Sequence, residues 1–414
     1  MVANDILAAR EERRAIISSL AAKSAVVSVK SNLPGENKNT PEAYLCTSYF
    51  ARIAEEVGSY GMKAYLGADG PAYIGRAEDG VLMKKRLSEI EADHPIGRLI
   101  DMDVTEMGGD RSLSRTGMRL CFLCGEPAFV CARRGAHERE ELIDYFNTSA
   151  RGYFTSLMAG LTSEAMLDEL ELTDKFGLVS PLSNGSHNDL NYGIMRKAID
   201  AIAPTLAECF ALGLSAECPE GLLASLRPIG LECEQRMLSV TLGANAYKGF
   251  IFVGGVLLAA AGYAVGRGLS FDEVYSVAKK ICSDMDAGLP TDTFGHKARG
   301  LGFGGIRAEA MAGFPAVKCA RVMLSEGKSP LSVLSFTVGS IEDSVLLKRA
   351  GTRERYEYYK ALISSLDVSD GDALAKINSL CESEGISIGG SADILIAAHL
   401  MQKIYNLFKW GNEI

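Results

Sequence analysis

The sequence lacks several features that whole classes of protein require. Its ten cysteines are too few to cross-link a chain of 414 residues, which excludes a disulfide scaffold. Positive charge is in deficit, because 43 Lys and Arg stand against 52 Asp and Glu and the net charge is −9. An acidic chain without a long basic stripe is poorly suited to a phosphate backbone, so we expect no nucleic acid as its principal partner.

Apolar sequence is also missing where a secretory signal would need it. The six charged residues from Asp5 to Arg14 leave no apolar segment behind the N-terminus. We therefore expect a cytoplasmic protein whose cysteines are reduced. Hydrophobic residues make up 47% of the chain and charged residues 23%, a balance that indicates globular domains and excludes a mostly disordered chain.

The longest uncharged run lies between Lys248 and Arg267 and contains eighteen residues. This length just reaches that of a membrane-spanning helix, but five glycines weaken that interpretation. No second segment of this kind is evident in the sequence. We predict a buried helix of a helical bundle, and no contact with a membrane.

The first third of the chain mixes two kinds of pattern. Helical periodicity over 5–20 and 41–60 alternates with short β-branched or alternating segments at Ala25–Lys30 and Arg98–Val104. This mixture predicts an α+β domain over residues 1–145.

The sequence pattern of the remainder of the chain is almost entirely helical. Stretches rich in Ala and Leu repeat with helical periodicity, and few segments suggest strands. These stretches are 193–214, 229–240, 249–267, 271–287, 307–325, 330–347 and 391–409. We therefore predict a multi-domain protein in which an all-α helical bundle over 150–414 follows the first domain, with the boundary near 138–155.

The segment RLIDMDV, Arg98–Val104, is the most informative strand candidate. With a period of two, Leu99, Asp101 and Asp103 lie on one face and the apolar residues between them on the other. Two neighbouring carboxylates repel each other unless a cation bridges them, and Mg²⁺ shared with substrate phosphates is the natural bridge. The alternative is a solvated face with two unrelated acids.

A cluster of soft ligands follows within seventeen residues, with the spacing C-x2-C-x6-C-x5-H: Cys121, Cys124, Cys131 and His137. Thiolates and an imidazole at this density suit a tetrahedral Zn²⁺. The alternative is three reduced core cysteines and a surface histidine. The other seven cysteines are scattered and are expected to be ordinary reduced residues.

A local cationic patch surrounds this cluster in an otherwise acidic protein: Arg115, Arg119, Arg133 and Arg134. Such a patch suits a polyphosphate or an acidic carrier protein. A solvated basic surface is the alternative.

Several of these segments, in this order, resemble the apo-citrate lyase phosphoribosyl-dephospho-CoA transferase family. They are ILAAREERR (6–14), NLPGENK (32–38), HPIGRLIDMDV (94–104), SLSRTGMRLCFLC (112–124) and VCARRGAH (130–137). The resemblance implies transfer of the citrate lyase prosthetic group to a serine of the acyl-carrier subunit, with release of pyrophosphate. It also implies that Asp101 and Asp103 hold the metal at the reacting phosphate, and that Arg98, Arg115, Arg119 and Lys38 bind the substrate.

Four polar, glycine-containing segments interrupt the helical pattern of the second part: 177–193, 241–249, 302–315 and 388–397. Glycines before a helix expose backbone N–H groups, and the helix dipole adds to their attraction for anions. Each segment alone is a weak signal. Asp393, for example, fits an ordinary acidic residue of a helix N-terminus as well as a functional one.

Together the motifs of the second part resemble the triphosphoribosyl-dephospho-CoA synthase family, which has an all-α fold. The matching motifs are LRPIGLECEQRML (226–238), KGFIFVGG (248–255), IRAEAMAGFPAV (306–317) and GGSADILI (389–396). The resemblance implies that a ribose hydroxyl of dephospho-CoA displaces adenine from ATP. Its candidate acid, base or Mg²⁺ residues are Asp189, Glu309 and Asp343. Its candidate substrate-binding residues are His187, Asn245, Lys248, Arg307, Arg349, Ser391 and Asp393.

The chain departs from that family at several polar positions. The family motif N-T-H-K-G corresponds to Asn245–Gly249, where this chain has Ala246 and Tyr247 in place of Thr and His. The family motif D-T-N corresponds to Asp343–Val345, which reads Asp-Ser-Val here. T-H-G-E corresponds to Thr293–His296, and the acid of G-L-V-D corresponds to Ser180. The second activity is therefore intact with a rearranged site, altered in substrate, or lost.

Three functions follow from these signals. The first is a bifunctional enzyme that makes the citrate lyase prosthetic group from ATP and dephospho-CoA and attaches it to the acyl-carrier subunit. The second is a transferase fused to a non-catalytic or altered-specificity nucleotide-binding helical domain. The third is a zinc-organised interaction protein without catalysis.

Overall fold

The computed structural model describes residues 2–115, 117–285 and 302–411. These residues divide into two compact units. The first, here called the sheet unit, contains the chain up to Phe154 together with Ala264–Phe271 and the residues from Asn406 onward. The second, here called the helical unit, contains Thr155–Tyr263 and Asp272–Tyr405.

The sheet unit is built on four antiparallel strands in the order β2-β3-β1-β4. Their bounds are β1 Ala25–Ser31, β2 Tyr60–Gly67, β3 Gly70–Ala77 and β4 Ile100–Thr105. β1 is central and its first five residues are buried, as expected of the segment AVVSV. β4 is an edge strand, so its outer side is free to carry polar groups.

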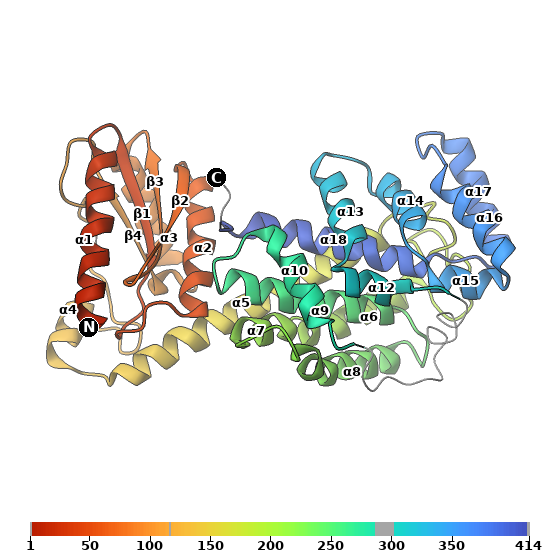
Figure 1. Ribbon diagram of the computed structural model, residues 1–414, viewed down its shortest axis with the longest axis horizontal. Coiled ribbons are helices and arrows are strands. Elements are labelled where there is room, and N and C mark those ends of the chain that lie inside the picture. The colour runs from red at the N-terminus through yellow and green to blue at the C-terminus, as the bar shows by residue number, and fades with distance from the viewer. Residues whose placement is uncertain (1, 116, 286–301, 412–414) are drawn as a thin grey trace. The chain divides into compact units, whose positions relative to one another are not determined.

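Helices cover the sheet of this unit: α1 Val2–Ala21, α2 Pro41–Glu56 and α3 Gly80–Asp93. In Figure 1 the strands lie between α1 and α2. Thr40 and Asp79 cap the N-termini of α2 and α3 by accepting the N–H groups of Ala43 and Leu82. The sequence patterns at 5–20, 25–30 and 41–60 thus predicted real elements, but they missed the β2–β3 hairpin and α3.

The predicted boundary region, 138–155, is helical over most of its length and is not a flexible linker. It lies almost wholly within one helix, α5 Arg139–Leu170, which is 32 residues long and belongs to both units. A short helix, α4 Ala128–Arg134, precedes it. Pro and Gly are nearly absent from α5, which has only two glycines inside it, and nothing in its sequence interrupts the helix.

The described residues of the helical unit form helices and no strand, as the all-α prediction expects. Besides parts of α5 and α18 Gly389–Leu407, they are α6 Tyr192–Leu206, α7 Glu208–Ser215, α8 Leu222–Val240, α9 Lys248–Val265, α10 Phe271–Ile281, α12 Gly305–Ala312, α13 Pro315–Ser325, α14 Pro330–Ser340, α15 Ser344–Ala350, α16 Arg353–Ser364 and α17 Gly371–Ser383. α6 packs against α8, and α14 packs against α16.

Three of the predicted helical stretches are each broken into two helices. The stretch 193–214 divides at Ala207 into α6 and α7. The break in 307–325 falls at Gly313 and Phe314, both with positive φ, and Pro315 then starts α13. The break in 330–347 falls before Asp343, which caps α15. Hydrophobic periodicity continues across these breaks, so the pattern alone does not reveal them.

The expectation of a single membrane-length segment is wrong, because within the described residues two helical stretches reach that length and composition. They are Lys248–Val265 and Tyr192–Ser215, and the bent pair α14–α15 reaches it if counted as one. Of their most apolar windows, 78% and 61% respectively is buried inside the protein. Their apolar residues therefore serve the helical core, as predicted for the first of them.

Candidate active sites

The edge strand β4 presents two carboxylates on one face. Asp101 and Asp103 are half-buried while the apolar residues that alternate with them are buried, which confirms the predicted alternation from Ile100 onward. Leu99 does not follow it, because Leu99 ends the 3-10 turn Gly97–Leu99 and is itself buried.

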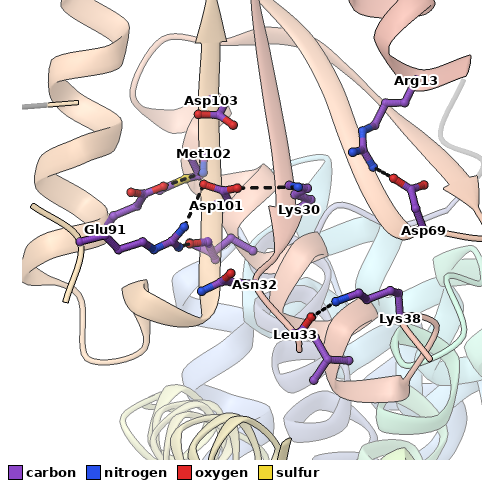
Figure 2. Close-up of polar contacts among 12 residues, drawn as sticks. Arg13, Lys30, Asn32, Leu33, Lys38, Asp69, Glu91, Asp101, Met102 and Asp103 are labelled. Carbon is purple, nitrogen blue, oxygen red and sulfur yellow. Dashed lines mark hydrogen bonds and ion pairs between the residues drawn. The ribbon is translucent and has the colours of Figure 1, made fainter. Parts of the chain in front are cut away.

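Cations of the protein surround both carboxylates. Asp101 lies 3.1 Å from Arg119 Nη1, 3.6 Å from Arg115 Nη2 and 3.8 Å from Lys30 Nζ. Lys30 is the direct cross-strand neighbour of Asp101 on β1, so the two side chains share a face (Figure 2). Lys84 of α3 lies 3.2 Å from Asp103. These cations relieve the carboxylate repulsion that the sequence predicts.

A third carboxylate, Glu91 of α3, lies behind this group. Its Oε1 accepts the N–H of Met102 at 2.6 Å, and its Oε2 lies 2.7 Å from Arg115 Nη2. Burial raises the pKa of Glu91, although the Met102 N–H and the guanidinium of Arg115 act in the opposite direction. Arg115 is therefore shared between a buried acid and the strand carboxylate.

The other two residues of this region that were predicted to bind the substrate, Arg98 and Lys38, contact backbone carbonyl groups. Arg98 donates to the carbonyl of Leu120, and Lys38 donates to that of Leu33. Burial, followed by nearby positive charges, lowers the pKa of Lys38. In Figure 2 Lys38 lies apart from Asp101. The structure thus brings Arg115 and Arg119 to the carboxylates and leaves Arg98 and Lys38 at the margin.

The predicted soft ligands form one cluster, in which the four candidate ligand atoms lie within 4.8 Å of one another: Cys121, Cys124, Cys131 and His137. Tetrahedral Zn²⁺ requires ligand atoms about 3.3–3.8 Å apart, so small adjustments suffice. Leu123 N–H points at Cys121 Sγ, 3.5 Å away. Burial opposes ionisation of Cys121, but N–H groups of Cys124 and Leu123 outweigh it and lower its pKa to about 7.

The arginine patch divides into two pairs. Arg115 and Arg119 turn toward β4, as described above. Arg133 and Arg134 lie in the last turn of α4 and are exposed.

In the helical unit, Lys248 and Arg307 line one pocket of about 510 Å³. Lys248 begins α9, and its Nζ lies 2.7 Å from Glu234 Oε2 of α8. Arg307 comes from α12. The rest of the wall is mostly apolar and includes Leu206, Leu223, Leu226, Ile251, Phe252 and Val256, with Arg227 as a further cation. An apolar pocket with a few cations suits a nucleotide or a coenzyme arm.

Three other predicted residues, His187, Asp189 and Arg349, form a separate group. Arg349 Nη2 lies 3.2 Å from His187 Nδ1, and Asp189 lies 3.9 Å from the same nitrogen. His187 Nε2 lies 3.3 Å from Ser387 Oγ. Burial, then the charge of Arg349, lowers the pKa of His187, so its ring is neutral near neutral pH.

Asp343 and Ser391 are joined in the core of the helical unit. The Asp343 carboxylate accepts the N–H groups of Val345 and Leu346 at the start of α15. It also accepts the N–H of Ser391 at 2.8 Å and its hydroxyl at 2.9 Å. Four hydrogen bonds occupy this carboxylate, which ties the first turn of α18 to α15.

Asp393, two residues after Ser391 in α18, lies against the N-terminus of α9. Its carboxylate accepts the N–H of Phe250, and a Cβ at Gly249 would lie only 1.9 Å from its Oδ2. Burial, followed by the negative charges of Asp343 and Glu169, raises its pKa well above the usual range. Burial therefore favours the neutral form of Asp393, which lies beside Gly249, a residue that lines the pocket.

The last two described candidates serve as caps. Asn245 Oδ1 accepts the N–H of Lys248 at 3.1 Å, and Glu309 Oε2 accepts the N–H of Ala316 at 3.0 Å. Burial raises the pKa of Glu309. The substituted motif Thr293–His296 lies outside the described residues.

Comparison with known proteins finds two families that match successive parts of the chain. Residues 1–152 match the family CitX, apo-citrate lyase phosphoribosyl-dephospho-CoA transferase, and residues 155–412 match CitG, ATP:dephospho-CoA triphosphoribosyl transferase. The chain belongs to the CitX–CitG fusion family. It is a transferase of citrate lyase prosthetic-group biosynthesis and attachment, which excludes a purely non-catalytic interaction protein.

Relatives of this CitX–CitG chain include fused and single proteins. Two are called Protein CitXG. The one from Leuconostoc mesenteroides subsp. cremoris is 29% identical over 370 residues, covering 78% of each chain. The one from Haemophilus influenzae is 29% identical over 360 residues, covering 78% of this chain and 77% of its own. A 2-(5''-triphosphoribosyl)-3'-dephosphocoenzyme-A synthase from Haemophilus ducreyi is 28% identical over 312 residues, covering 66% of this chain and 96% of its own.

Sequence reasoning missed several residues of both sites. In the CitX region these are Lys30, Lys84 and Glu91, which reach β4 only through strand pairing and helix packing. In the CitG region they are Arg227 and Glu234. Both stand in the motif LRPIGLECEQRML, so the charged residues of this motif were an available signal.

Proposed function

We propose that this chain catalyses two consecutive transfers. In the first, the ribose 2'-hydroxyl of dephospho-CoA forms a bond to C1 of the ATP ribose while the bond to adenine breaks. The hydroxyl loses one proton in this step, and the departing adenine gains one. In the second, the serine hydroxyl of the citrate lyase acyl-carrier subunit forms a bond to the α-phosphorus of the triphosphoribosyl product while pyrophosphate leaves.

The observation that carries this proposal is the composition of the β4 face. Two half-buried strand carboxylates and Glu91 lie among four cations, which leaves one positive charge in excess. A polyphosphate needs such an excess, and the guanidinium of Arg119 matches the geometry of phosphate oxygens. Arg115 and Arg119 bind the triphosphate in this proposal and orient its α-phosphorus toward the serine.

The same carboxylates fit Mg²⁺. Asp101 and Asp103 supply hard oxygen ligands on one face of one strand, and neither is fully buried. Bound Mg²⁺ would neutralise negative charge on the triphosphate. Lys30 and Lys84 then balance whatever charge the carboxylates retain.

The pocket of the CitG region fits the first transfer. Its apolar walls suit an adenine ring or the pantetheine arm, and Lys248, Arg227 and Arg307 suit the triphosphate of ATP. We assign Asp393 as the acid that protonates the departing adenine, because its carboxyl lies against Gly249 in the pocket wall and burial favours its neutral form.

The other acids have different roles in this proposal. Asp343 and Glu309 accept backbone N–H groups and are positioning residues, since their hydrogen bonds fix helix ends. Asp189 is the most exposed of the candidates and lies beside the neutral ring of His187. We assign Asp189 as the base for the ribose hydroxyl and Arg349 as a further phosphate ligand.

The Cys/His cluster of the CitX region is assigned as a structural Zn²⁺ site. Three thiols and one imidazole complete a tetrahedral set, which is typical of closed structural sites. Purified protein is expected to contain about one Zn²⁺ per chain. Protein that neither retains zinc nor takes it up would contradict this assignment.

The two transfers are tested separately. Incubation with ATP and dephospho-CoA should release free adenine, and protein without adenine release lacks the synthase activity. Addition of the apo-carrier subunit should then raise its mass by the prosthetic group. An unchanged mass would remove the transferase half.

A second candidate for the CitG region is a nucleotide-binding module without catalysis. It is motivated by Tyr247, which replaces an imidazole of the family motif. Among the described residues, its hydroxyl has no hydrogen-bond partner, and the ring is buried. ATP binding without adenine release in calorimetry and product analysis would support this candidate over the first.

Replacement of Lys248 by Met tests the pocket. Loss of its charge should raise the KM for ATP about 10- to 100-fold, the size expected for one charge-assisted phosphate contact, with a smaller change in kcat. Arg236→Met is the control, because Arg236 lies on α8, is exposed and forms its ion pair among the described residues with Glu232. An unchanged KM in Lys248→Met would remove Lys248 from the site.

Gly249→Ala tests the contact between α9 and α18. The new methyl group would overlap Asp393 Oδ2, so either the buried Asp393 side chain or one of the two helices must shift. We expect a loss of about 1–3 kcal/mol in the free energy of unfolding and a fall in adenine release. Gly160→Ala, in α5 with no atom within 4 Å of the new group, should leave both unchanged or slightly increase stability. Denaturant titration measures the difference, and equal stabilities would contradict the close contact.

A further inference from the structure

The cysteine segment, defined here as residues 117–137, joins the metal cluster to the phosphate-binding residues. It leaves the sheet after β4 and contains no strand of the sheet and only one short helix, α4. It carries the four metal-ligand candidates and also Arg119, which reaches Asp101.

Backbone hydrogen bonds place Arg119 next to the cluster. The Arg119 carbonyl accepts the N–H of Ala128 at 2.8 Å, and the N–H of Cys121 donates to the Glu126 carbonyl at 2.6 Å. Leu120 and Pro127 pair between these two rungs. Cys121 and Cys124 therefore form the tip of a tight hairpin, and Arg119 lies at its base.

The base of this hairpin is attached to β4 and to the turn before it. Arg119 donates to the carbonyl of Ile100 in addition to its ion pair with Asp101. Arg98 donates in the other direction, to the carbonyl of Leu120. Arg119 thus connects the hairpin to β4, and Arg98 connects the turn before β4 to Leu120, the residue directly before Cys121.

Apolar packing does little to hold this segment. Most of its large apolar side chains are exposed: Met118, Leu120, Leu123 and Phe129. Cys121 and Cys131, in contrast, are buried. A short segment without a core of its own is the situation in which a structural metal replaces hydrophobic burial.

The chain also turns where the ligands require it. Gly125, directly after Cys124, and Gly135, between Cys131 and His137, both have positive φ with open space beside them. These turns bring the second thiol back toward the first and the imidazole back toward α4. Their free surroundings indicate that glycine is needed for backbone direction and not for close packing.

We propose that the metal bound by this cluster acts as a positioning element for the transferase, by holding the hairpin so that Arg119 stays directed at Asp101. The inference rests on the proposed Zn²⁺ site and on the proposed carrier loading. Loss of the metal releases the hairpin and removes one guanidinium from the triphosphate. The CitG region contains none of these residues, so its adenine release is independent of the metal.

The test uses the full-length chain and the variant Cys124→Ser, with Cys218→Ser as the matched control. Cys124 and Cys218 are both exposed, but Cys218 is no part of the cluster. Zinc content is measured by mass spectrometry of the metal. Cobalt absorption reports tetrahedral thiolate coordination directly, and trypsin cleavage after Arg119 reports release of the hairpin.

We expect the wild-type and Cys218→Ser proteins to hold about one zinc per chain and to resist cleavage after Arg119. Cys124→Ser, and wild-type protein stripped by a chelator, should lose the metal and become cleavable. Their carrier loading should fall about 10- to 100-fold, chiefly through a higher KM for the triphosphoribosyl donor, with adenine release unchanged. Zinc should restore the stripped wild-type protein and not the variant.

Two results would overturn the inference. Confirmed metal loss with cleavage and loading at wild-type levels would separate the metal from Arg119. A wild-type protein that loads the carrier but binds neither zinc nor cobalt would remove the metal site. Failure of the proposed function gives a different result, namely zinc-replete protein that does not load the carrier, while the cobalt and trypsin measurements still decide whether the metal holds the hairpin.

Discussion

Asp101→Asn should nearly abolish loading of the carrier subunit while adenine release continues at the wild-type rate. The substitution keeps the shape of the side chain and removes its charge. Loss of a charged group that stabilises a phosphoryl-transfer transition state typically lowers the rate about 10²- to 10³-fold, or about 3–4 kcal/mol. Asp101 is also the common partner of Lys30, Arg115 and Arg119, so the cations lose the group that orders them.

The same substitution should affect stability only slightly. Asp101 and its three partners are all partly exposed to solvent, and ion pairs of this kind contribute about 1 kcal/mol or less. Asp110→Asn is the control, because Asp110 is an exposed carboxylate in the segment that follows β4. Carrier mass and adenine are measured in parallel. Loading by Asp101→Asn at a rate near that of wild type would show that the β4 face is not the transferase site.

Asp393→Asn is expected to have the opposite selectivity. Adenine release should fall about 10²-fold, the usual contribution of a general acid, whereas carrier loading from supplied donor should be unaffected. Asparagine can still accept the N–H of Phe250, so the contact between α18 and α9 is retained. A loss of activity without a loss of stability would therefore come from the missing proton.

The pH dependence distinguishes an acid from a residue that only supports the fold. Because burial raises the pKa of Asp393, the protonated form persists to higher pH than for an ordinary aspartic acid. Adenine release by the wild-type protein should decline as the pH rises through that raised pKa, and the decline should be absent in Asp393→Asn. If the variant keeps both the wild-type rate and the wild-type profile, Asp393 is a structural residue.

Local pattern was sufficient to find β4 and the metal cluster. The alternation of RLIDMDV predicts which side chains of β4 are buried, because a strand has a fixed period of two and one face meets the core. Cysteine spacing likewise identifies ligands that are close in the chain. Leu99 was misplaced because the 3-10 turn before β4 has a different period.

Local sequence patterns could not predict contacts between residues that are far apart in the chain and close only in the folded structure. Lys30 reaches Asp101 through the register of β1 with β4, and Lys84 and Glu91 reach the strand through packing of α3. The continuity of α5 across the predicted boundary was missed for a related reason. A change from mixed to purely helical sequence patterns marks where one hydrophobic core gives way to the next, but it does not require the helix at that position to end.

Motifs of the CitG region were recognised from the sequence, but the contacts of their residues were not. Asp343 carries a functional-looking charge and in fact accepts four hydrogen bonds at helix ends. Asp393 looked like an ordinary helix-terminal acid and instead lies against the wall of the pocket. Sequence motifs mark where polar groups are concentrated, and burial decides which of them are free for chemistry.

One coupled measurement tests the central claim of two transfers in one chain most directly. The protein is incubated with ATP, dephospho-CoA and the apo-carrier subunit, and adenine, pyrophosphate and carrier mass are followed together. We predict equal amounts of adenine, pyrophosphate and loaded carrier, with loading dependent on ATP. Loading that occurs only when the triphosphoribosyl donor is supplied, with no adenine from ATP, would contradict the account.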